Sequence, residues 1–217
     1  MWLAVVSQPC DRSCAIPAPG SLDQTLGEFW VENPWEIVKH GHNLSAYERK
    51  RTWMNIRGNH FIDLSYLNGT DNDGDGRCVV ACDFRNNGRL DLLVRQVGGG
   101  ALLLYENNYP QRHYLKVSLR GSASNRLGVG ARLSATVNGQ KLVREMFPIN
   151  SYRSQMPNLV HFGLGAAGQV ENLEIRWPSG KLQKFPKLKA DTHIVVREDQ
   201  DGEAALQNVV PGRVIEP

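Results

Sequence analysis

The chain has 217 residues, of which 41% are hydrophobic and 22% are charged, and this composition is typical of a globular protein with one or two domains. Its 25 basic and 22 acidic residues leave a net charge of +3, which is too small to predict binding to nucleic acid or to an acidic membrane surface. No stretch approaches the ~18 consecutive apolar residues of a membrane-spanning helix, so we predict no membrane insertion.

Residues 1–45 are predicted to form an irregular N-terminal segment, because prolines and a glycine interrupt its first half. The opening MWLAVVSQPC has a short apolar run but lacks the positively charged start of a secretory signal peptide, so we predict no signal peptide in this chain. His40 and His42 are interpreted as surface or capping histidines. The alternative, a metal site, needs a further ligand that the sequence does not identify.

The cysteines form two pairs of identical spacing, Cys10 with Cys14 and Cys78 with Cys82. On one strand, Cys78 and Cys82 would point to the same face ~13 Å apart, too far for a disulfide bond. We interpret these two as buried free thiols, whereas Cys10 and Cys14 suit a local disulfide in an oxidising compartment. Zinc bound by all four is the alternative, although the spacing is not that of a zinc finger.

Residues 46–110 read as short strands separated by turn signals. TWMNI and HFIDLSYL flank a turn at residues 57–59 and predict a hairpin. The apolar runs CVVAC, LDLLVRQV and ALLLYE follow, with acidic loops before and after the first of them. Together these patterns predict one antiparallel sheet.

The first acidic loop places Asp71, Asp73 and Asp75 at alternate positions, and Gly76 follows them. A short loop of this kind aims several hard oxygen ligands inward while the glycine takes the sharp turn, which favours Ca²⁺ over a soft metal. An EF-hand is excluded, because Cys82 stands where its bidentate glutamate would be. The alternative is a metal-free turn, since Asp, Asn and Gly also suit hairpin loops.

The second acidic loop carries Asp83, Asn87 and Asp91 as candidate ligands for a second, weaker Ca²⁺ site. Arg85 stands where a third acidic or amide side chain is expected. Between residues 71 and 91 there are five aspartates and three arginines, which leaves a net charge of −2 without metal. This repulsion favours a bound cation.

Residues 111–198 contain roughly seven further strand patterns, the number expected for a β-sandwich. Asn138-Gly139 between two such runs is the strongest hairpin signal in the chain. No segment of ten or more residues shows a helical period, so the fold is predicted to be all-β. We expect one propeller-type antiparallel blade packed beside a C-terminal β-sandwich, with residues 199–217 as a polar, partly irregular tail.

Catalysis has little support in the sequence. Ser151, Ser154 and His161 lie in one region, but no acidic partner or nucleophile elbow accompanies them. We therefore predict no catalytic residue and a protein that is not an enzyme.

Two families share ordered motifs with this chain. Residues 46–108, with ERKRTWMN, FIDLS, DGDGR, DFRNNGRLDLLV and LLLYEN, resemble one blade of the FG-GAP/VCBS repeats, an integrin-like propeller family with Ca²⁺ loops. Residues 111–198, with HYLKVSLRG, SNRLGVGARL, SYRSQ, HFGLG and IRWPSG, resemble the ASPIC/UnbV domain. The order is similar to the C-terminal part of cartilage acidic protein-like and bacterial ASPIC/UnbV proteins. The two acidic loops differ from the Ca²⁺-loop pattern of the FG-GAP/VCBS repeat, the first at Val79 and the second at Arg85 and Asn87.

The resemblance implies an extracellular or periplasmic protein and three functional hypotheses. The first is a non-catalytic binding or adhesion module, stabilised by Ca²⁺, with a protein or glycan ligand. The second is a structural or assembly domain of a larger propeller protein, because a lone blade leaves its faces and edges uncovered and favours self-association. The third is an enzyme of unknown reaction, which would need a deep pocket with convergent titratable groups.

Overall fold

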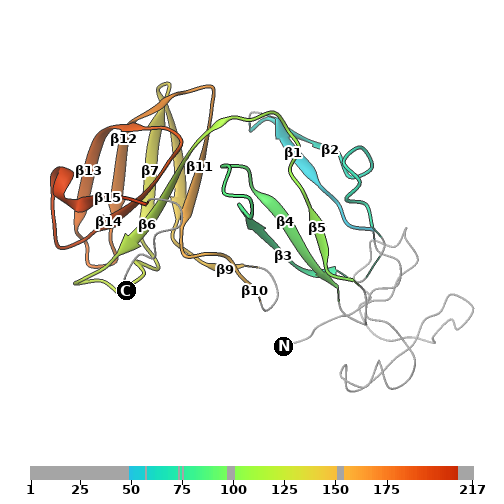
Figure 1. Cartoon of the computed structure of the whole chain (residues 1–217), viewed down its shortest axis with the longest axis horizontal. Coiled ribbons are helices and arrows are strands. Elements are labelled where there is room, and N and C mark those ends of the chain that lie inside the picture. Colours follow the sequence, from blue (N-terminus) through green and yellow to red (C-terminus); the bar gives the residue numbers. More distant parts are fainter. Residues whose placement is uncertain are drawn as a thin grey trace, which may run out of the picture. The chain divides into compact units, whose positions relative to one another are not determined.

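A computed structural model describes residues 49–56, 58–72, 74, 76–96, 101–150 and 154–209. The predicted irregular segment 1–45, with its cysteines and histidines, lies outside these residues. The described chain is built from strands and one 3₁₀ turn, η3 (Gly202–Ala205), so the predicted all-β fold is confirmed (Figure 1). None of the helices in this part of the chain is long and apolar enough to cross a membrane.

The chain divides into two compact units. The first comprises residues 1–77 and 94–103, and the second comprises residues 78–93 and 104–217. The second acidic loop, which the sequence assigns to the blade, is therefore grouped with the C-terminal strands.

The first strands form the predicted hairpin, β1 (Trp53–Ile56) and β2 (His60–Asp63), which pair antiparallel. Gly58 takes the turn with a φ of 79°, and its N–H donates to the Asn55 side chain at 2.7 Å. A second sheet has the order β3-β4-β5, with β3 (Gly76–Cys82), β4 (Asp91–Gln96) and β5 (Leu103–Tyr105).

Cys78 and Cys82 lie on β3 and form no disulfide bond, as predicted. They are half-buried rather than fully buried, because no side chain of β3 is completely covered. Burial nevertheless raises the pKa of the Cys82 thiol, and the neighbouring Asp83 carboxylate raises it further. Cys82 is therefore an unreactive thiol at neutral pH.

Two four-stranded sheets make up most of the second unit. The first has the order β11 (Val160–Gly165), β6 (His113–Arg120), β14 (Thr192–Arg197), β15 (Leu206–Asn208). The second has the order β13 (Leu182–Lys189), β12 (Gln169–Arg176), β7 (Arg132–Val137), β8 (Gln140–Glu145). A short antiparallel pair, β9 (Ile149–Asn150) and β10 (Ser154–Gln155), follows β8.

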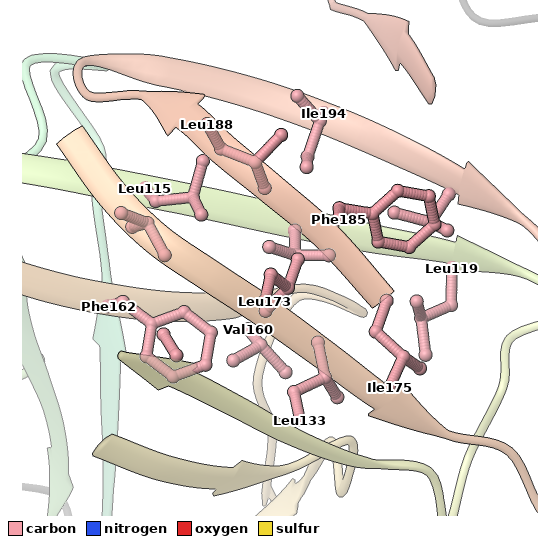
Figure 2. Close-up of a cluster of buried hydrophobic side chains, with 14 of the residues drawn as sticks. Leu115, Leu119, Leu133, Val160, Phe162, Leu173, Ile175, Phe185, Leu188 and Ile194 are labelled. Carbon is pink, nitrogen blue, oxygen red and sulfur yellow. The ribbon is translucent and has the colours of Figure 1, made fainter. Parts of the chain in front are cut away.

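Alternating apolar residues of the two sheets bury one shared core. Leu115 and Phe162 come from the first sheet, Leu173 and Phe185 from the second, and none is more than 2% exposed (Figure 2). Because successive strand residues point to opposite faces, the same strands present polar residues to solvent. This arrangement confirms the predicted sandwich-like architecture of the C-terminal region.

Two features of the sandwich depart from the sequence patterns. Strand β14 pairs with β6 in parallel, whereas the other sandwich pairings are antiparallel. The tail expected to be polar and irregular supplies η3 and β15, because β15 pairs with the free edge of β14 and Ala205 is fully buried. Backbone pairing at an edge strand thus orders residues whose side chains gave no strand signal.

Candidate cation sites in the acidic loops

The first acidic loop directs oxygen atoms at a lysine. Lys50 Nζ donates hydrogen bonds to Asn72 Oδ1 at 2.9 Å and to the Gly74 carbonyl at 2.6 Å. Asp71 pairs instead with the Arg49 guanidinium at 2.9 Å. Asp73 and Asp75, the other predicted ligands, lie outside the described residues. The Asn72 and Gly74 oxygens therefore converge on the Lys50 ammonium, and Asp71 faces the Arg49 guanidinium.

Backbone and hydroxyl contacts fix Lys50 beside the loop. The Lys50 N–H donates to the Asn72 carbonyl at 3.0 Å. Two residues later, the Thr52 hydroxyl bonds to the Thr70 hydroxyl at 2.7 Å, immediately before the loop. A Cβ on Gly76 would lie only 2.6 Å from Lys50 Cε, so glycine at this position leaves room for the lysine to enter. The sequence predicted this glycine for its turn, not for this contact.

The second acidic loop also surrounds a lysine. Lys116 Nζ, from β6, donates to Asp83 Oδ2 at 2.6 Å and to Asn86 Oδ1 at 2.7 Å. The Lys116 and Asp83 side chains are each only 5% exposed. Burial alone would raise the pKa of Asp83, but the hydrogen bonds from Lys116 and from the N–H groups of Gly88 and Asn87 lower it. Asp83 is therefore an ionised partner in a buried ion pair.

The other predicted ligands of this loop point elsewhere. The buried Asp91 carboxylate accepts hydrogen bonds from Arg85 and from the Asn107 N–H, both at 2.8 Å. Asn87 Oδ1 accepts the Arg89 N–H at 3.0 Å and so closes a local turn. Arg85, which the sequence placed where a ligand was expected, supplies the positive charge that Asp91 needs.

The loop packs on β6 and β11 through an aromatic contact. The Tyr114 and His161 rings stack with centroids 5.9 Å apart, and His161 Nε2 lies 2.8 Å from the Gly88 carbonyl oxygen. A Cβ on Gly88 would fall 2.0 Å from the Tyr114 ring, so the close approach requires glycine. Burial lowers the pKa of His161, and the Gly88 contact opposes this effect without reversing it. His161 is therefore predominantly neutral at neutral pH.

The two acidic loops differ in how well they fit Ca²⁺. In the first loop, hard oxygen atoms already converge on one cation, which is the donor chemistry that Ca²⁺ requires. In the second loop, Asp83 is occupied by the buried Lys116 and by backbone amides, and Asp91 Oδ1 already accepts hydrogen bonds from Arg85 and from the Asn107 N–H, so this loop fits a metal less well. No group of three or more His, Cys, Asp or Glu suited to a metal occurs among the described residues.

A further buried carboxylate, Glu198 after β14, connects two of the predicted motifs. It accepts hydrogen bonds from the N–H groups of Ser122 and Ser124 at 2.7 and 2.8 Å, and from the hydroxyls of Ser124 and Ser179 at 2.7 and 2.5 Å. Burial by itself raises the pKa of Glu198, but these donors outweigh it and lower the pKa to about 2. Glu198 therefore fastens the SNRLG segment to the WPSG turn.

Both motifs also close on themselves. The Asn125 side chain accepts the Val129 N–H and donates to the Val129 carbonyl, both at 2.8 Å. Trp177 is buried, and its indole N–H donates to Gln183 at 2.7 Å.

Residues 121–203 match the family model described as ASPIC and UnbV. The resemblance stated for the C-terminal region is thus confirmed within this range, whereas the FG-GAP/VCBS resemblance stays a prediction. No curated protein matches the chain.

A cleft of about 420 Å³ opens between the second acidic loop and one end of the first sandwich sheet, partly within the ASPIC/UnbV region. Its lining residues are Asn87, Gln111, Arg112, His113, Tyr114, Gly165, Ala166 and Asp191. Asp191 is already engaged, because its carboxylate lies 2.7 Å from His113 Nδ1. The cleft thus offers amide, guanidinium and aromatic groups to a ligand.

Sequence reasoning missed the central role of Lys116. The signal in the sequence was a lysine between two apolar residues, Leu115 and Val117. Strand alternation places Lys116 on the same face as Tyr114 and Ser118, opposite the apolar residues. In the structure, the second acidic loop covers the Tyr114 and Lys116 end of that face. A lone lysine among buried neighbours was the available clue, because such a charge requires a partner.

Proposed function

We propose that this chain is a non-catalytic binding module that acts outside the cytoplasm and binds a protein or glycan ligand. The observation that carries the proposal is the cleft beside the second acidic loop. Its polar groups suit directional hydrogen bonds, and Tyr114 gives it an apolar surface, a combination typical of sites that recognise polar ligands. Its carboxylate, Asp191, is paired with His113.

The ligand site is tested by glycan-array binding of the whole chain and of a Gln111→Ala/Arg112→Ala variant. Both side chains are exposed and line the cleft, so their removal should reduce binding at least about tenfold while leaving Tm unchanged. Gln140→Ala/Lys141→Ala, on exposed positions of β8, is the matched control. Binding by the cleft variant equal to that of the wild type would exclude the cleft as the site.

We further propose that Ca²⁺ stabilises the first acidic loop through Asp71, Asp73 and Asp75. The support is the oxygen-rich loop and the convergence of Asn72 and Gly74 oxygens on the Lys50 ammonium. Lys50 is only partly buried, and a divalent ion would displace its amine from the loop. Residual negative charge from the loop aspartates favours this exchange.

Calcium titration after chelation tests this site. Ca²⁺ should raise Tm by several degrees and give a calorimetric binding signal, and Asp71→Asn should weaken both. Asp199→Asn, in an exposed ion pair with Arg197, should respond to Ca²⁺ as the wild type does. An unchanged Tm together with a flat calorimetric baseline would refute Ca²⁺ binding by the chain.

A second candidate function is a structural or assembly domain. Trp53 and Phe61, on β1 and β2, are 57% and 61% exposed, and Leu104 on β5 is 52% exposed. Apolar residues on short sheets with open edges favour association with other strands. Light scattering should then detect self-association that increases with concentration, and a monomer at all concentrations would exclude this alternative.

A further inference from the structure

The Lys116 ammonium is held by oxygen atoms of the second acidic loop and by an aromatic ring of its own strand. An ammonium has three N–H donors, and two of them reach Asp83 Oδ2 and Asn86 Oδ1 at 2.6 and 2.7 Å. The nitrogen also lies 5.3 Å from the centre of the Tyr114 ring, within reach of a cation–π interaction. Lys116 therefore has the surroundings of a bound cation, with oxygen ligands and an aromatic wall.

The Asp83 carboxylate is equally occupied. Oδ1 accepts the Asn87 N–H at 2.9 Å, and Oδ2 accepts the Gly88 N–H at 2.7 Å as well as Lys116. A divalent ion beside this carboxylate would face a buried positive charge and would have to displace backbone donors. Asp91 is also engaged, because its Oδ1 accepts hydrogen bonds from Arg85 and from the Asn107 N–H.

We propose that Lys116 is a built-in replacement for Ca²⁺ in the second acidic loop. The lysine belongs to β6, a core strand of the sandwich, so its charge is delivered whenever that strand forms. The loop of residues 83–91 then folds onto β6 and β11 without metal. Ca²⁺ depletion would act on the first loop alone and leave the second loop in place.

Hydrogen exchange measured peptide by peptide tests this inference on the whole chain. In the wild type, the amides of Asn87 and Gly88, which donate to Asp83, should exchange equally slowly with chelator and with Ca²⁺. Lys116→Met keeps the length of the side chain but removes the charge. It should accelerate exchange in residues 83–91 at least about tenfold, because Asp83 loses its buried partner.

Lys141→Met, on an exposed position of β8, is the matched control and should leave exchange in residues 83–91 unchanged. Loss of protection in the wild-type loop on chelation would overturn the proposal, and so would unchanged protection in a folded Lys116→Met variant. If Lys116→Met fails to fold, the wild-type comparison still decides the question. Peptides covering residues 71–76 report hydrogen exchange in the first loop separately. Failure of Ca²⁺ binding in the first loop can therefore be distinguished from failure of the proposal for Lys116.

Discussion

Two buried acidic side chains show how single residues stabilise the second unit. The charge of Asp83 is balanced by the Lys116 ammonium, whereas the charge of Glu198 is stabilised by hydrogen bonds from two amides and two hydroxyls. A buried carboxylate is tolerated only when such donors replace the water that it has lost. Each therefore fixes the segments that supply its donors.

Glu198 makes the folding stability of the protein decrease in the acidic range of pH. Its folded pKa of about 2 lies below the ordinary value of 4.5, so its contribution is complete above about pH 4.5 and is lost as the pH falls toward 2. Glu198→Gln should lower the free energy of unfolding at pH 7 by about 1.5–3 kcal/mol. The difference between the two proteins in urea denaturation should shrink between pH 4.5 and 2.

The exposed Glu203, on η3, provides the control for this measurement. Glu203→Gln should track the wild type across the same range. A stability difference between Glu198→Gln and the wild type that stays constant from pH 7 to 2 would contradict the assigned pKa.

The hairpin between β7 and β8 depends on the backbone conformation of its two turn residues. Asn138 and Gly139 both have positive φ, 49° and 71°, as a two-residue turn between twisted antiparallel strands requires. The same logic applies to Gly58 between β1 and β2. These elements form where local sequence and sheet geometry agree.

Gly139→Ala should destabilise the protein by about 1–2 kcal/mol, because a Cβ in the left-handed region is strained even where space is open. Gly168→Ala is the matched control, since its Cβ would also meet nothing within 4 Å and its φ is not in that region. Guanidinium denaturation midpoints compare the two variants. Equal midpoints would show that the turn tolerates a side chain.

The sandwich as a whole depends on the core that both sheets share. Leu173 on β12 is completely buried, and it lies among the labelled core side chains of both sheets in Figure 2. Removing such a side chain loses apolar contact and leaves a cavity that the strands fill only in part.

Leu173→Ala should therefore cost about 2–5 kcal/mol in the free energy of unfolding, measured by guanidinium denaturation. Leu182→Ala, at a leucine that is 48% exposed on the neighbouring β13, should stay within about 0.5 kcal/mol of the wild type. Similar losses for both variants would mean that the core is not shared as described.

Local sequence was sufficient to predict the all-β class, the hairpins at residues 57–59 and 138–139, and most strands of the sandwich. Alternation of apolar residues and the positions of Asn and Gly act over a few residues, so they are readable without a structure. The acidic loops were also recognisable, since clustered Asp, Asn and Gly residues lie next to each other in the chain.

Only the tertiary structure decided which cation each loop faces. Lys50 meets Asn72, and Lys116 meets Asp83, across 22 and 33 residues of sequence. The parallel pairing of β6 with β14 joins residues still farther apart in the sequence. Charge pairing and strand order act through space, and the spacing of residues along a chain does not record which distant partner folding brings to them.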